Sequence, residues 1–231
     1  MEKNKIKLTP SQALRLYTGR GTGRWISSVT GVMLGVYVAS VLTLAGLAGA
    51  DRGFSFSAEL MREKGLGIMV FAIVAGTAGT ILSVMSFEKD APGGKFFRST
   101  AAGFEAFRKM RVGMLTVIVA STAAFLASVW LLDIIFPIMN NCTAVCISIG
   151  SFLLLATGLS GLVNIISNSS CRGIVNCVIF MAFSLGGAAL VVFSGGRLSA
   201  VHAIAAVSAA ALIPIGHRVM LDNYREKRWN D

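Results

Sequence analysis

The chain has 231 residues, of which 55% are hydrophobic and only 14% are charged, and its mean hydropathy is +0.72. A soluble domain carries about 25% charged residues, so this composition leaves too little polar surface for a soluble globule. The net charge of +10 does not indicate nucleic-acid binding, because the basic residues lie at the ends of apolar blocks and no polar stretch is long enough to form a basic domain.

Six apolar blocks along the chain predict six transmembrane helices. The hydrocarbon core of a bilayer is crossed by about 20 helical residues, and each block reaches roughly that length. The predicted spans are Ile26–Ala48, Leu66–Phe87, Gly113–Phe136, Thr143–Ile166, Ile174–Phe193 and Ala200–His217. The predicted fold class is therefore all-α, a polytopic membrane protein with six transmembrane helices.

The basic residues predict the orientation of these spans. Four of the 21 Lys and Arg residues, namely Arg52, Arg62, Lys64 and Arg197, lie in the first, third and fifth connections or beside them, and the others lie in the N-terminal segment, the alternate loops and the C-terminal tail. Cytoplasmic loops carry the excess of Lys and Arg. We therefore expect both termini in the cytoplasm, with the lipid bilayer as the first partner, and a multi-pass protein of a bacterial cell membrane.

The chain divides into three predicted regions: a basic cytoplasmic segment at 1–24, the transmembrane domain at 25–217 and a basic cytoplasmic tail at 218–231. In the first region the run Thr9-Pro10-Ser11 predicts the start of a surface helix, with Thr9 as its cap and Pro10 in its first turn.

A second cytoplasmic helix is predicted at 95–111, between the second and third spans. Aromatic residues recur there at helical spacing, and charged residues lie on another face, which is typical of an amphipathic helix at a membrane interface. The candidate residues for contacting a partner are Phe97, Arg98, Phe104, Phe107, Arg108 and Lys109.

Small residues within the spans predict close helix packing. Gly31 and Gly35 form a GxxxG pair in the first span, and Gly76 with Gly79 and the pair Gly186-Gly187 add further points of close approach. Such residues let two helix backbones approach each other. The alternative is that they form a dimer interface.

One motif suggests catalysis, and the depth of its residues argues against it. The run Gly158-Leu159-Ser160-Gly161 in the fourth span, with His202 in the sixth, resembles the serine and histidine of rhomboid intramembrane proteases. Both spans run inward, so Ser160 lies about 25 Å deep while His202 lies near the outer surface. A nucleophile and its base must come within about 3 Å, so we expect no catalytic residues.

No cofactor or metal site is predicted. The two histidines, His202 and His217, lie at opposite ends of one span and cannot share a haem. The cysteines divide between the outer side, with Cys142 and Cys146, and the inner side, with Cys171 and Cys177; a disulfide between the first two stays open, with simple packing as the alternative. Asp133 lies at the outer end of its span, so no ionisable residue near the midplane is available to couple an ion.

The topology resembles the permease subunits of type-2 ABC exporters, which have a cytoplasmic N-terminal surface helix, six spans and an amphipathic helix between spans two and three. The resemblance implies that this helix contacts a separate cytoplasmic ATPase and that the chain, as a homo- or heterodimer, moves an apolar or amphipathic cargo. A different class, a non-transporting membrane scaffold or regulatory subunit, remains the alternative, followed by an intramembrane serine hydrolase.

Overall fold

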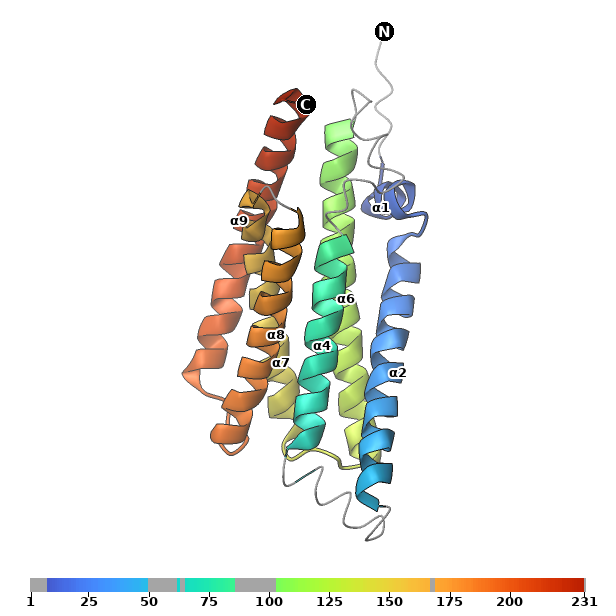
Figure 1. The fold of residues 1–231 in the computed structure, drawn as a ribbon, viewed down its shortest axis with the longest axis vertical. Helices are drawn as coiled ribbons and strands as arrows, with labels where there is room; N and C mark the ends of the chain where they lie inside the picture. Colours follow the sequence, from blue (N-terminus) through green and yellow to red (C-terminus); the bar gives the residue numbers. More distant parts are fainter. Residues whose placement is uncertain (1–7, 50–61, 63–64, 86–102, 167–168, 231) are drawn as a thin grey trace.

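The structure is a computed structural model and describes residues 8–49, 62, 65–85, 103–166 and 169–230. Within these ranges the chain is all-helical, and six helices are long and apolar enough to cross a membrane, so the predicted fold class is confirmed (Figure 1). The α-helices are α1 (Pro10–Thr18), α2 (Thr22–Gly49), α4 (Leu66–Met85), α6 (Gly103–Ile135), α7 (Cys142–Leu162), α8 (Ser169–Phe193) and α9 (Ala200–Asn230), and the 3₁₀ turn η1 (Val163–Ile165) follows α7.

Helices α6 and α9 extend furthest beyond the spans predicted for them. Helix α6 begins at Gly103 and α9 continues through Pro214 to Asn230. The length of apolar sequence sets only the minimum needed to cross lipid, and a helix continues where its flanks gain contacts. Here the extensions contact each other, because the rings of Phe107 and Tyr224 are stacked with their centroids 3.8 Å apart. Residues 103–111 are accordingly the first turns of α6, and 95–102 lie outside the described residues.

Helix α1, the first turns of α6 and the last turns of α9 meet at one end of the bundle, which we call the basic end (Figure 1). An even number of spans requires the N-terminal and C-terminal ends of the chain to lie on the same side of the membrane. A second apolar core holds this end together, formed by buried Ala13, Leu14, Tyr17, Leu82, Ala106, Phe107, Met110, Met114, Val117, Ile118 and Met220.

Helix α1 lies on α6. Its start is capped as the sequence predicts, with the Gln12 amide donating to the Thr9 hydroxyl (3.3 Å) and the Thr9 amide donating to the Gln12 side chain (2.9 Å). A Cβ atom added at Gly113 would lie 2.9 Å from the carbonyl oxygen of Pro10, so the glycine allows the two backbones to touch. One face of α1 is therefore buried against the bundle.

The main core lies between α2, α4, α6, α7 and α8. Tyr37, Phe71 and Phe125 come from three helices and form an aromatic cluster with centroids 5.1 to 6.1 Å apart. Offset and edge-on ring pairs of this kind add about 1 kcal/mol beyond the area they bury. Helix α7 is the most buried span and α2 the least.

Glycines make the closest helix contacts, but not at every predicted pair. Gly79 meets the ring of Phe180, and a Cβ atom added at Gly161 would lie 2.6 Å from the Cα of Gly216, so α4 touches α8 and α7 touches α9. Gly31 and Gly35 are exposed, and no described atom lies within 4 Å of a Cβ added at either. Within the described chain these two glycines pack against nothing.

Substitution Gly161→Ala should destabilise the bundle by about 1 to 3 kcal/mol, because the added methyl group enters the α7–α9 crossing. The matched control is Gly186→Ala, since a Cβ there meets no atom within 4 Å and alanine favours the helix. Thermal unfolding in a mild detergent measures both. An equal melting temperature for the two variants would contradict the close crossing.

Cysteine labelling tests the orientation predicted from the basic residues. In a cysteine-free background, Arg225→Cys at the end of α9 should react with a membrane-impermeant maleimide only after the cells are opened. Arg197→Cys, in the connection between α8 and α9, should react in intact cells; both positions are exposed. Reaction of the Arg225→Cys variant in intact cells would reverse the assigned orientation.

Candidate functional site

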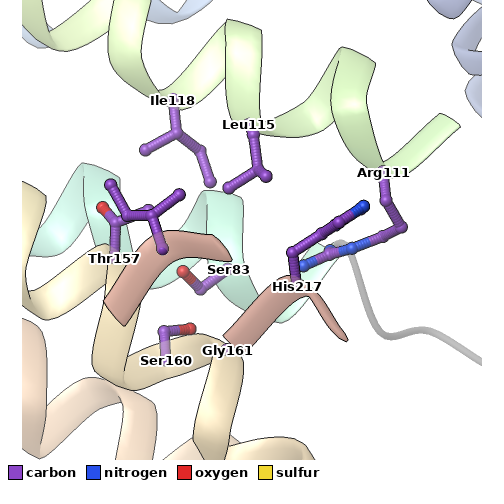
Figure 2. Close-up of a pocket in the computed structure, with 9 residues that line it drawn as sticks. Ser83, Arg111, Leu115, Ile118, Thr157, Ser160, Gly161 and His217 are labelled. Atoms are coloured by element: carbon purple, nitrogen blue, oxygen red, sulfur yellow. The ribbon is translucent and has the colours of Figure 1, made fainter. Parts of the chain in front are cut away.

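A small polar pocket lies near the basic end, between α4, α6, α7 and α9. Its size is about that of one water molecule. Figure 2 shows the side chains that converge on it from these four helices. The lining residues are Ser83, Arg111, Leu115, Ile118, Thr157, Ser160, Gly161, Ile213 and His217. Polar groups are thus gathered inside an otherwise apolar bundle, which makes this pocket the candidate functional site.

Arg111 is the charged residue of the pocket, and it is only 5% exposed. Helix periodicity explains why it turns inward, because Phe107 and Met114 lie one turn away on the same face and are both buried. The side chain of Tyr17 on α1 is near enough to interact with the guanidinium electrostatically. Sequence reasoning counted Arg111 among the basic residues of the cytoplasmic loop, because charge alone does not tell which way a side chain points.

His217 reaches the pocket from α9 and lies beside Arg111 (Figure 2). Its position depends on the preceding residue, since Gly216 lets α9 approach α7 closely enough to bring His217 to the wall formed by Ser160 and Gly161. The Nδ1 atom is buried and has no hydrogen-bond partner within the described part of the chain. A buried polar atom without a hydrogen-bond partner lowers the free energy of unfolding by about 1 to 3 kcal/mol.

Three hydroxyl groups complete the polar wall. The Thr157 hydroxyl donates to the Leu153 carbonyl oxygen at 2.8 Å, and the side chains of Ser83 and Ser160 are 2% and 4% exposed. A serine hydroxyl both donates and accepts, and it rotates to suit its neighbour. Hydroxyl oxygens from two helices therefore lie along the wall of the pocket.

A buried asparagine lies at the same level on α8. Helices α4 and α8 are antiparallel and touch where Gly79 meets Phe180, so one turn toward the basic end brings Ser83 level with Asn176. Asn176 is fully buried, and neither of its amide atoms has a hydrogen-bond partner among the described residues. Polar side chains from four helices and the buried amide of α8 thus form one layer across the bundle.

The chemistry of this layer favours a polar or anionic ligand over a metal ion. A guanidinium repels cations and binds carboxylate or phosphate oxygens through several N–H groups. Among the residues that the structure describes, no group of three or more His, Cys, Asp or Glu side chains could hold a metal ion. The layer offers one fixed positive charge, hydroxyl groups and an imidazole.

The serine and histidine that resemble a protease pair lie far apart. His202 is at the start of α9, where its Nδ1 accepts from the Ser199 amide (3.0 Å) and its ring stands edge-on to Phe152 at 6.2 Å. Phe152 is about 12 Å along α7 from Ser160. The structure instead places Ser160 with His217, a pair that sequence reasoning missed. The signal was present, because α7 and α9 both run inward and the two residues lie at similar distances from the helix starts.

Among the candidate residues for partner contact, the four that the structure describes differ in their exposure. Phe107 is buried in the stack with Tyr224, and Phe104 lies beside the same tyrosine at 6.4 Å. Arg108 and Lys109 contact Glu105 at 2.8 and 3.7 Å, and the Arg108 side chain is about half exposed. Phe97 and Arg98 lie outside the described residues. Arg108 and Lys109 are therefore the described candidates that remain accessible.

The end of the bundle opposite the basic end holds further polar groups, which contact residues at the helix ends. The Asp133 carboxylate accepts from the amides of Ile138 and Met139, both at 2.9 Å, and so closes the turn after α6. Cys142 and Cys146 are buried thiols with their sulfur atoms 3.9 Å apart on the first turn of α7. Cys171 and Cys177 are exposed on α8, toward the other end.

Comparison with known proteins adds no assignment: no protein-family model, no curated protein and no solved structure matches the chain. The resemblance to ABC exporter permeases thus rests on topology alone.

Replacing His217 tests whether the pocket is built for stability. We expect His217→Leu to raise the free energy of unfolding by about 1 kcal/mol, because it removes a buried atom without a partner. On the same helix, His202→Leu should lower it by about 1 kcal/mol, because losing the contacts of Nδ1 with the Ser199 amide and hydroxyl outweighs removing its Nε2 atom, which is buried without a partner in the described chain. Thermal unfolding in neutral detergent gives both values. A loss of stability in the His217 variant equal to that in the His202 variant would show a structural role for His217.

Proposed function

We propose that this chain is a permease-like subunit of a bacterial cell membrane, which moves an apolar or amphipathic cargo by means of a separate cytoplasmic ATPase. The observation that supports it is the course of α6. A single helix from Gly103 to Ile135 carries accessible Arg108 and Lys109 at the basic end, then Arg111 in the pocket, and then continues through the bundle.

Helix α6 would act as the moving part. Arg108 and Arg111 lie within one helical turn, about 5 Å along the axis, so a partner that pushes on Arg108 also displaces the pocket wall. Helix α1 lies on the same turns, and Tyr224 of α9 stacks on Phe107. A force at the basic end would therefore reach the helices that line the pocket together rather than one at a time.

The distribution of acidic residues supports an external source of energy. A proton- or ion-coupled carrier needs carboxylates near the middle of the membrane. In the described spans Asp133 closes a turn at the outer end, and Glu105 contacts Arg108 and Lys109 at the basic end. The buried side chains in the main core of the described bundle are instead apolar, which suits a cargo with an apolar part.

A scaffold or regulatory subunit is the second candidate, and helix α2 favours it. This helix is the least buried span, and Gly31, Val32, Gly35 and Val36 are exposed on it. Two helices approach each other through such small and branched residues, so α2 could join a second copy or another membrane protein. A scaffold needs no ATPase, and the experiment below distinguishes the two candidates.

Charge reversal on α6 tests the partner. The double variant with Arg108→Glu and Lys109→Glu should lose at least tenfold of the ATPase that co-purifies with the tagged chain from its native membranes, because the accessible basic surface becomes acidic. The measurement is nucleotide hydrolysis and mass spectrometry of the purified complex. Insertion and melting temperature should stay close to those of the unmodified chain.

The control reverses two other accessible charges at the same end, with Arg218→Glu and Arg225→Glu on α9. It changes the net charge equally and should retain the ATPase. If no ATPase accompanies the unmodified chain, or if both double variants retain it in full, the permease proposal fails and the scaffold becomes the better reading.

A further inference from the structure

We propose that the polar pocket binds a phosphate oxygen of an anionic lipid headgroup that enters from the cytoplasmic leaflet. This inference rests on the proposed function, because it names the cargo class of the same site: an amphipathic lipid with a phosphate group. It is carried by the convergence of Arg111, His217 and two serines on one small space between four helices (Figure 2).

The charge of the pocket selects an anion. Arg111 is nine-tenths or more buried and presents a planar set of N–H donors, which match the oxygens of a phosphate group. Inside a bundle such charge-assisted hydrogen bonds are about twice as strong as those between neutral groups. Arg108 and Lys109, one turn nearer the basic end, add positive charge along the way in.

The imidazole supplies a further hydrogen bond. Buried polar atoms in folded proteins have hydrogen-bond partners as a rule, and the Nδ1 atom of His217 has none within the described chain. With its proton on Nδ1, the neutral ring would donate to a phosphate oxygen. The side chains of Ser83 and Ser160 line the same space.

The size and surroundings of the pocket favour a lipid over free phosphate. The space is about that of one water molecule, so it takes one headgroup oxygen and leaves the rest of the headgroup near Arg108. Val112, the residue after Arg111, is exposed on α6, and Val119, two turns further along the helix, is exposed on the same face. An acyl chain lying along this face of α6 would keep its headgroup at the level of the pocket.

Binding is measured on the purified full chain in a neutral maltoside detergent, with short-chain phosphatidic acid as the probe and titration calorimetry as the readout. We expect Arg111→Gln to weaken binding at least about tenfold, the effect of losing one charge-assisted contact. Arg111→Lys should recover part of the affinity. Arg225→Gln, which removes an exposed charge at the end of α9, should change the affinity by less than about threefold.

Several results would overturn the proposal. Equal losses in the Arg111→Gln and Arg225→Gln variants would show general surface attraction. For the unmodified chain, equal affinity for short-chain diacylglycerol, which has no phosphate, would remove the role of the anion. Competition by inorganic phosphate at the same concentration as the lipid would show that the free anion is the ligand.

Two features keep the test independent of folding and of the ATPase. If Arg111→Gln does not fold, His217→Gln takes its place: a loss of at least about threefold with an unchanged melting temperature supports the proposal, and unchanged affinity overturns it. Because no ATPase is present in the assay, absence of lipid binding leaves the permease proposal standing. Lipid binding without a co-purifying ATPase would contradict the permease proposal and support the proposal that the pocket binds lipid.

Discussion

The close crossing of α7 and α9 is the contact on which the rest of the site depends. Gly158 and Gly161 on one helix meet Gly216 on the other, and larger side chains there would force the helices apart. In lipid, helices associate through packing rather than through exclusion of water, so backbone contact of this kind is a main source of stability. The same contact brings His217 level with Ser160 and closes one side of the pocket.

The basic end shows a second constraint, the burial of a charge. Arg111 lies under α1 and beside α9, in a region where Phe107, Tyr224 and Leu14 form an apolar cover. Taking a charged group out of water costs several kcal/mol unless hydrogen bonds replace its hydration. The charge of Arg111, the imidazole of His217 and the buried amide of Asn176 lie in one layer, which is why we propose a ligand site there.

Helix α6 connects these two observations. It carries residues exposed to the cytoplasmic side in the proposed orientation, the buried guanidinium, and the aromatic core around Phe125 in one continuous rod. A displacement of a loop would reach the pocket less directly, because a loop bends, whereas a helix moves as a stiff rod. The peripheral α2, by contrast, contributes one aromatic side chain, Tyr37, to the core. Its other face is left exposed to lipid or to a partner.

The sequence by itself determined the number of spans, their order and the common side of the two ends, because crossing a bilayer requires uninterrupted apolar length. It also predicted the capped start of α1, since Thr9, Pro10 and Gln12 act on their own neighbours. Only the tertiary structure decided that Arg111 and Phe107 turn inward, that Gly31 and Gly35 stay exposed while Gly161 is buried, and that Ser160 meets His217 rather than His202. Hydropathy indicates which segments lie in lipid, whereas these outcomes depend on how each helix is rotated about its axis and on which helices it packs against.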